Sequence, residues 1–313
     1  MKPQTIALTA LYTFLRRPIT SHAFSTAANT AAKGQSEVAI KAAKDFTVSQ
    51  RQKLKDLGAL DIQRPIKITA EAIVDGSSTS DSKSNVVTKT IHFQRHGQGF
   101  HNLICDIWRE KGLPIDFDSQ DPSLNPVIRN EFLDPPLTEN GRQQCKDRRE
   151  QCSTLNPELV IVSPLLRCIQ TAQLSFRDHT PQARDIPWIA HEGCREELGL
   201  LTGNKRRAKD EIEFEFPFID FSLLEHEDDV LWDEYGDRRE TLLEKSERIY
   251  DFLVKFVMDR PEKDIAIVSH SAYLFTLLNA VMDIDDEDLR FWFLTSEVRS
   301  MQVTFQTNDE YKK

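Results

Sequence analysis

Hydrophobic and polar positions along this chain recur with the spacings of strands and helices. Residues 86–93 alternate in side-chain character and are rich in β-branched residues, which predicts a strand. Residues 264–270 form a second apolar strand that ends in a histidine, and Leu159–Val162 is a short run of the kind that is buried in a sheet. Two further strands are expected near residues 187–191 and at residues 300–306.

The segments between these strands have helical patterns. The longest of them, residues 237–258, places its apolar side chains on one stripe, and Thr138 is expected to cap another helix. Helices are predicted for residues 99–110, 138–151, 165–176, 237–258 and 272–282. Strands that alternate with helices predict an α/β fold with a mainly parallel central sheet and helices on both faces.

The first 36 residues differ from the rest in composition. They contain Lys2, Arg16, Arg17 and Lys33 but no acidic residue, and they are rich in serine, threonine and alanine. This composition is typical of a transit peptide and favours delivery to a mitochondrion or a plastid. Two alternatives stay open: a secretory or two-step plastid route, suggested by the apolar residues 6–15, and an arm without targeting function on a cytoplasmic protein.

Overall composition narrows the class of protein. The 313 residues are 39% hydrophobic and 29% charged, which is typical of a globular protein, and no apolar run is long enough to span a bilayer. The net charge of −10 argues against a nucleic-acid partner, although a pocket on an acidic protein can still be positive. Five scattered cysteines fit free thiols in a reducing compartment, and not a disulfide framework or zinc site.

Side chains that bind or attack anions follow the predicted strands. Parallel strands bring such residues to one edge of a sheet, where α/β proteins bind ligands. Two arginines would neutralise a phosphoryl group, a histidine would attack it and a carboxylic acid would protonate the leaving oxygen. The candidate residues, in chain order, are Arg95, His96, Arg167, Arg195, Glu196, Glu197 and His270.

The segment Arg95-His96-Gly97-Gln98-Gly99-Phe100-His101-Asn102 resembles the signature of the histidine phosphatase superfamily, which is also called phosphoglycerate mutase-like. The resemblance is strongest to the plant and fungal phosphoglycerate mutase-like branch. It implies a three-layer sandwich and a catalytic domain at residues 85–307, preceded by a variable extension and linker at residues 37–84. Further matching motifs lie at residues 137–141, 163–172, 194–196 and 268–271, and branch-specific stretches lie at residues 204–207, 219–222 and 229–232.

This resemblance implies a role for each candidate residue. His96 would be the nucleophile that forms a phosphohistidine, and Glu196 would be the general acid. The phosphate pocket would be lined by Arg95, Asn102, Arg167 and His270.

Several positions leave the assignment open. Glu197 is the rival acid, because the register of the motif is ambiguous there. Gly99 stands where many members have a serine, so one hydroxyl contact to phosphate is missing or is supplied by another group. Arg206 and Arg207 either recognise a second anionic group or form a solvated face. By contrast, the histidines that flank the nucleophile, His92 and His101, are expected to be structural.

The sequence therefore predicts a phosphomonoester hydrolase that acts on a small phosphorylated metabolite. No cofactor and no metal are expected, because histidines and carboxylates lack ligand spacing and arginines already supply positive charge. A mutase that returns the phosphoryl group to another hydroxyl is the main alternative, and a catalytically silent phosphate-binding protein is the second. No membrane or nucleic-acid partner is expected, and the sequence does not indicate the natural substrate or the oligomeric state.

Overall fold

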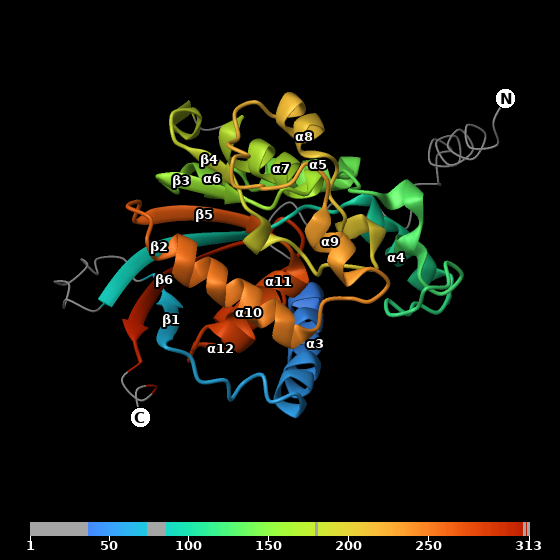
Figure 1. Cartoon of the computed structure of the whole chain (residues 1–313), viewed down its shortest axis with the longest axis horizontal. Coiled ribbons are helices and arrows are strands. Elements are labelled where there is room, and N and C mark those ends of the chain that lie inside the picture. The colour runs from blue at the N-terminus through green and yellow to red at the C-terminus, as the bar shows by residue number, and fades with distance from the viewer. Residues whose placement is uncertain (1–36, 74–85, 179–180, 309–310, 312–313) are drawn as a thin grey trace. The chain divides into compact units, whose positions relative to one another are not determined.

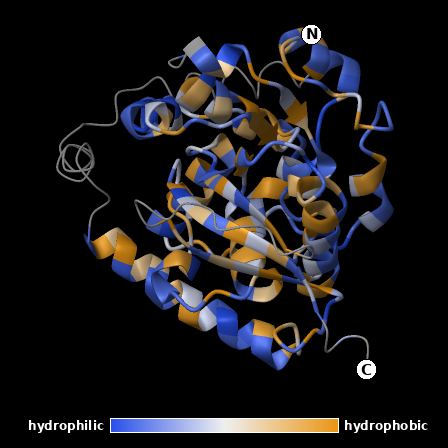
Figure 2. Ribbon diagram, turned by 90° about the vertical axis from the view of Figure 1, so that its left-hand side faces the viewer, coloured by the Kyte–Doolittle hydropathy of each residue, from blue (hydrophilic) through white to orange (hydrophobic). Residues whose placement is uncertain are grey.

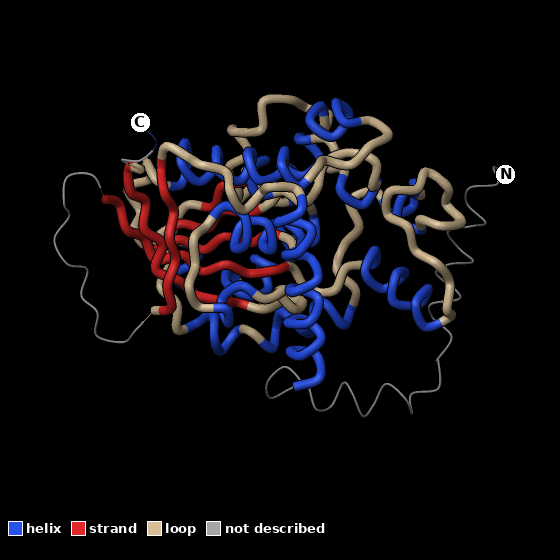
Figure 3. The backbone as a smooth tube through the Cα atoms, turned by 90° about the horizontal axis from the view of Figure 1, so that it is seen from below, coloured by secondary structure: helices blue, strands red, loops and turns tan. Residues whose placement is uncertain are grey.

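A computed structural model of the chain describes residues 37–73, 86–178, 181–308 and 311. Within them, a six-stranded sheet has the strand order β1-β6-β2-β5-β3-β4 (Figures 1 and 3). Its strands are β1 (Ile66–Ala72), β2 (Val86–Arg95), β3 (Leu159–Val162), β4 (Trp188–Ala190), β5 (Asp264–Ser269) and β6 (Val298–Thr307). Neighbours from β2 to β4 are parallel, and β6 runs antiparallel to β2 and β1. The prediction of a mainly parallel sheet is therefore confirmed.

Helices connect these strands. The α-helices are α3 (Glu37–Asp56), α4 (Phe100–Glu110), α5 (Glu139–Asp147), α6 (Arg149–Ser153), α7 (Leu166–Ala172), α8 (Lys209–Glu215), α9 (Val230–Tyr235), α10 (Leu242–Phe252), α11 (Ser271–Thr276) and α12 (Glu287–Arg290). Three of them continue directly into π-helical turns, which are η3 (Gln173–Arg177), η7 (Leu253–Val257) and η8 (Leu277–Val281). Short 3₁₀ turns are η1 (Pro126–Ile128), η2 (Asn130–Phe132), η4 (Pro181–Arg184), η5 (Glu192–Cys194) and η6 (Thr202–Asn204).

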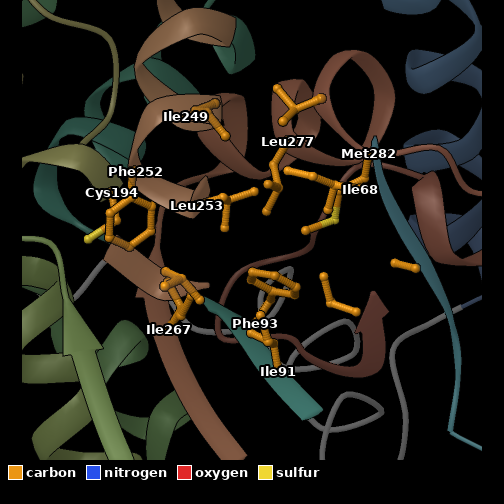
Figure 4. Packing of buried hydrophobic residues seen from close by; sticks show 14 of the residues in the cluster. Ile68, Ile91, Phe93, Cys194, Ile249, Phe252, Leu253, Ile267, Leu277 and Met282 are labelled. Carbon is orange, nitrogen blue, oxygen red and sulfur yellow. The ribbon is translucent and has the colours of Figure 1, made fainter. Parts of the chain in front are cut away.

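The two faces of the sheet are covered by different helices. Along β5, Ile265 and Ile267 join one hydrophobic cluster, whereas Ala266 and Val268 join another, because successive side chains of a strand point to opposite faces. The first cluster includes residues of α10 and α11, and Figure 4 shows helical side chains of this cluster meeting those of the strands. The second includes residues of α6 and α7. In Figure 2 the hydrophobic colour gathers on the central strands, and hydrophilic segments lie along outer helices and loops.

Helix ends follow local capping chemistry. The helix predicted for residues 237–258 begins at Leu242, because Thr241 forms a capping box with Glu244: each side chain accepts the backbone N–H of the other, at 3.2 and 2.8 Å. The N-cap predicted at Thr138 is confirmed, since its hydroxyl accepts the Gly141 N–H at 2.9 Å. The single helix predicted from there is divided into α5 and α6 at Arg148.

The sequence did not predict β1 or α3. Residues 37–84 were interpreted as an extension and linker, yet all seven residues of β1 pair with β6. This strand therefore belongs to the same sheet as the motif-bearing strands. The predicted targeting segment, residues 1–36, and the glycine- and serine-rich residues 76–82 lie outside the described residues, so targeting and localisation stay predictions.

Candidate active site

His96 and His270 follow neighbouring parallel strands. In the register of β2 and β5, Arg95 lies opposite Ser269, and the His96 N–H donates to the Ser269 carbonyl oxygen at 3.0 Å. The centroids of the two imidazole rings are 5.1 Å apart. The sheet thus brings together two histidines that are distant in the sequence, at the edge where parallel strands end.

His96 is held as a neutral imidazole with a defined tautomer. Its side chain is buried, and its Nδ1 lies 2.6 Å from the carbonyl oxygen of Gly97. Because a carbonyl can only accept, Nδ1 carries the hydrogen and the lone pair is on Nε2. Burial lowers the pKa of His96 well below its usual range, and the guanidiniums of Arg167 and Arg95 lower it further. The ring is therefore unprotonated at neutral pH, as a nucleophile must be.

Arg167 is the second residue of α7, which follows β3. The side chain is 1% exposed, and its Nη1 donates to the Gly203 carbonyl oxygen at 2.6 Å while Nη2 donates to Asn204 Oδ1 at 2.9 Å. Burial lowers the pKa of Arg167, but a guanidinium still keeps its charge at neutral pH. Turn η6 thus fixes the orientation of this cation. The buried Nε of Arg167 has no hydrogen-bond partner among the described residues.

Arg95 ends β2 and supplies a second cation. Its Nη1 donates to the carbonyl oxygen of Phe293 at 2.8 Å, and its Nε is buried without a partner in the described part of the chain. Burial lowers the pKa of Arg95 to about 10, against the opposing attraction of Glu196, so the group is charged at neutral pH. One buried and one half-buried cation therefore make this edge of an acidic protein locally positive.

Glu197 is engaged in a buried ion-pair network. Its Oε1 accepts from the Lys245 ammonium at 2.7 Å, and its Oε2 accepts from the Arg239 guanidinium. Burial raises the pKa of Glu197, but Lys245 and Arg239 outweigh this effect and hold the pKa at about 2. A carboxylate with so low a pKa carries no proton to donate at neutral pH, which removes Glu197 as the rival acid.

Glu196 has different surroundings, although it is the adjacent residue. Its two carboxylate oxygens accept the backbone N–H groups of Ala272 and Tyr273, at 3.2 and 3.0 Å, at the start of the helix that follows His270. Burial raises the pKa of Glu196, and the neighbouring Glu197 charge also raises it. The structure therefore places a carboxyl group with a raised pKa at the start of the helix that follows His270.

His270 is oriented by residues of the β3–α7 junction. Its Nε2 lies 2.8 Å from Ser163 Oγ and 3.3 Å from Cys168 Sγ. Burial lowers the pKa of His270 well below its usual range, and Arg167 and His96 lower it further. The ring is neutral, and its position is fixed by the element that also carries Arg167.

Asn102 and His101 lie in the first turn of α4. The Oδ1 atom of Asn102 accepts the Gly99 N–H at 3.0 Å, so this predicted phosphate ligand also caps the helix. His101 was expected to be only structural, yet its ring centroid lies 5.4 Å from that of His96. The sequence did not identify this proximity, because only the capped first turn of α4 rotates the residue toward the nucleophile.

Arg206 does not have the substrate-binding role that was considered for it. The side chain is buried, its Nε donates to Glu192 at 2.9 Å, and its Nη atoms donate to the backbone carbonyl oxygens of residues 207 and 226–228. Its donors are thus used to hold the loop before α9. Arg207 pairs with Glu215 at 2.9 Å at the surface. His92 is structural as expected, since its ring contacts Ser300 and Asp264.

Two supporting residues of the site were not singled out from the sequence. Asn204 orients Arg167, and the signal for it was its place in a branch-specific motif. Asp134 is buried, and its Oδ1 accepts the Leu166 N–H at 2.8 Å, which anchors the first turn of α7. Burial raises the pKa of Asp134 to about 6. The sequence shows only that Asp134 lies in a proline-rich loop, and this position does not indicate a contact with Leu166.

No cluster of metal-ligating side chains occurs among the described residues. All five cysteines are buried free thiols. In the same part of the chain no helix has the length and apolar character needed to cross a membrane. A cavity of about 580 Å³ lies elsewhere, lined in part by Arg51, Arg64 and Arg290, and includes none of the predicted site residues.

Comparisons with known proteins identify the family of this chain. A family model described as histidine phosphatase superfamily (branch 1) matches residues 128–310, a span that begins after the Arg95-His96-Gly97 motif. A phosphoglycerate mutase-like protein of Arabidopsis thaliana is 35% identical over 251 residues, which cover 70% of this chain and 86% of that protein. Phosphoglycerate mutase-like protein 1 of the same plant is 32% identical over 246 residues, with 69% and 81% covered.

A solved structure of phosphoglycerate mutase from Bacillus anthracis is also similar. The similarity covers 72% of this chain and 92% of that one, with 16% identity and a TM-score of 0.42. The family model and the two plant proteins, and not this structural match, are the comparisons that identify the family.

Proposed function

This chain belongs to the histidine phosphatase superfamily, and we propose that it hydrolyses small phosphomonoesters through a phosphohistidine at His96. One observation supports the proposal most. The hydrogen bond from Nδ1 to the Gly97 carbonyl leaves the lone pair on Nε2, in a ring kept neutral by burial and by the charges of Arg167 and Arg95.

In the first step, Nε2 of His96 attacks phosphorus and the bond from phosphorus to the ester oxygen breaks. The departing alkoxide takes the proton of Glu196, whose pKa is raised by burial and by the neighbouring Glu197 charge. Arg167 and Arg95 neutralise the phosphoryl oxygens, and turn η6 holds the Arg167 fork in place before the reaction begins.

In the second step, water attacks the phosphohistidine and the phosphorus–nitrogen bond breaks. The Glu196 carboxylate accepts a proton from this water, which restores both the acid and the neutral His96. When Nε2 of His270 accepts a hydrogen bond from the Ser163 hydroxyl, the hydrogen of the imidazole ring is on Nδ1. This N–H group then serves as a further donor to the phosphoryl group. Asn102 is assigned to the same pocket.

The test uses hydrolysis of p-nitrophenyl phosphate by the purified protein in EDTA, with acid quenching to detect an acid-labile phosphoenzyme. We expect a His96→Ala variant to lose turnover and the phosphoenzyme together. The exposed His226 provides the matched control, and His226→Ala is expected to keep both. Turnover by the His96→Ala variant at the wild-type rate would refute the assignment.

The names of the plant relatives keep a mutase as the second candidate. A mutase forms the same phosphohistidine but returns its phosphoryl group to a hydroxyl of the substrate and not to water. Incubation with phosphoglycerate separates the two: free phosphate is expected for the hydrolase, and an isomer without free phosphate would favour the mutase. A screen of phosphorylated metabolites would then identify the substrate.

A further inference from the structure

His101 has an unsatisfied polar atom and a ring that lies near the nucleophile. It is the second residue of α4, and its ring centroid is 5.4 Å from that of His96, nearly as close as the ring of His270. Its Nδ1 is buried and has no hydrogen-bond partner among the described residues. A buried nitrogen without a partner is uncommon in a folded protein, and beside a nucleophile it indicates a contact made by a ligand.

The ring of His101 occupies the space that a side chain at position 99 would need. A Cβ atom at Gly99 would lie 2.7 Å from both Nδ1 and Cε1 of His101, which is closer than real Cβ contacts. Gly99 has a φ of −92°, which other residues also adopt, so the backbone does not require glycine there. Glycine at this position therefore makes room for the imidazole.

The turn that orients Arg167 also lies close to His101. A Cβ atom at Gly203 would lie 3.7 Å from Cβ of His101, and the Gly203 carbonyl oxygen accepts from Arg167 at 2.6 Å. His101 thus lies close both to the loop that follows His96 and to the turn that orients the Arg167 guanidinium.

The charges around His101 favour an anion at its free nitrogen. Burial lowers the pKa of His101 well below its usual range, and Arg167, His96 and Arg95 lower it further. The ring is therefore a neutral imidazole, with one N–H donor and one acceptor, in positive surroundings. A phosphoryl group attacked by His96 brings oxygens that accept such a donor.

We propose that His101 is a direct ligand of the substrate phosphoryl group and donates a hydrogen bond to it from Nδ1. The imidazole ring of His101 occupies the space that a side chain at position 99 would need. This inference rests on the proposed function, because it assumes that a phosphomonoester binds against His96. It assigns substrate recognition to a residue for which the sequence suggested only a structural role, and it explains the pairing of Gly99 with His101 in this chain.

The first test is the variant His101→Phe, which keeps an aromatic ring but removes both nitrogens. Orthovanadate binding, measured by isothermal titration calorimetry, reports on the phosphoryl pocket without turnover. We expect orthovanadate affinity and kcat/KM for p-nitrophenyl phosphate to fall about 10- to 100-fold, the range for loss of a hydrogen bond to a charged group. The thermal unfolding midpoint should stay unchanged, and His226→Phe at the surface is the matched control.

The second test exploits the shared space of positions 99 and 101. Gly99→Ser alone is expected to weaken orthovanadate binding, because its Cβ collides with the imidazole, and His101→Ala alone removes the donor. The double variant Gly99→Ser, His101→Ala should bind orthovanadate more tightly than His101→Ala, since the serine hydroxyl enters the space that the ring leaves.

Two results would overturn the inference: wild-type orthovanadate affinity in His101→Phe, or a double variant no better than His101→Ala. If the wild-type protein binds orthovanadate but His96 is never phosphorylated, the proposed function fails. The binding measurements on the His101 variants still decide the present inference in that case.

Discussion

Replacing Glu197 by glutamine is expected to destabilise the fold strongly. The variant keeps the size of the side chain but removes the charge that pairs with Lys245, whose ammonium is 2.7 Å from Oε1 and whose side chain has no exposed surface. Removal of one partner from a buried ion pair leaves an uncompensated charge and typically costs about 3–5 kcal/mol.

The pKa of Glu197 gives a second value for the stability that this ion pair contributes. A pKa of about 2 in the folded protein, against the ordinary 4.5, corresponds to ~3 kcal/mol of stability at neutral pH. This contribution is fully present above the unfolded pKa and is lost as the pH falls through the folded one. The stability gap between wild type and Glu197→Gln should therefore narrow between about pH 4.5 and pH 2.

Urea unfolding followed by circular dichroism at a series of pH values measures this gap. Glu234→Gln makes the same chemical change at an exposed position and is expected to alter the unfolding free energy by less than ~0.5 kcal/mol. A loss below ~1 kcal/mol in Glu197→Gln at pH 7 would refute the reasoning, and so would a gap that widens as the pH is lowered.

Three further predictions concern catalysis. Glu196→Gln should lower kcat for a poor leaving group by about 10²- to 10⁴-fold in steady-state assays, and it should abolish the fall in activity as the pH rises through the raised Glu196 pKa; an unchanged pH profile would contradict this. Arg167→Lys should weaken orthovanadate binding at least about tenfold in calorimetry, since lysine lacks the planar fork whose separate nitrogens contact Gly203 and Asn204; wild-type affinity would disprove it. Dialysis against EDTA should leave aryl phosphate turnover intact, whereas a loss reversed by a divalent cation would show that a metal takes part.

Strands β3 and β5 could be predicted from the sequence because they are buried on both faces. Every residue of Leu159–Val162 is buried, and in Asp264–Ser269 all but the first are, so the apolar runs are unbroken. The position of His96 and His270 at one edge then follows from the parallel arrangement of the sheet. The prediction of this part of the site therefore needed only the local sequence pattern and a general rule of sheet topology.

The edge strand β1 could not be predicted in the same way. Only Ile68 and Ala70 of its seven residues are buried, and it obtains its hydrogen bonds from β6 at the other end of the chain. The residues of β1 nevertheless alternate strictly between apolar and polar types, which is the pattern of a half-buried strand. The sequence therefore carries a local signal for this strand that the prediction missed, whereas its pairing with β6 is a long-range contact that no local pattern indicates.

Long-range contacts also decide which of two similar side chains enters the site. Arg206 was considered for substrate binding from its sequence context, but carbonyl oxygens of residues 226–228 use its donors. Glu196 and Glu197 cannot be separated by spacing, because they are adjacent in an irregular loop. Lys245 on α10 captures Glu197, and the amides at the start of α11 meet Glu196. A single sequence does not contain these distances.

The environment of Glu196 suits a group that must act first as an acid and then as a base. Burial and the Glu197 charge favour its protonated form, whereas the Lys245 charge and the Ala272 amide favour its carboxylate. Burial dominates, so the pKa is raised, but the opposing contacts stabilise the anion that remains after the leaving group has taken its proton. Because Lys245 is neutralised directly by Glu197, Glu197 reduces the pull of this cation on the adjacent carboxyl. The ion pair therefore has two effects: it stabilises the loop, and it limits how far the Lys245 charge lowers the pKa of Glu196.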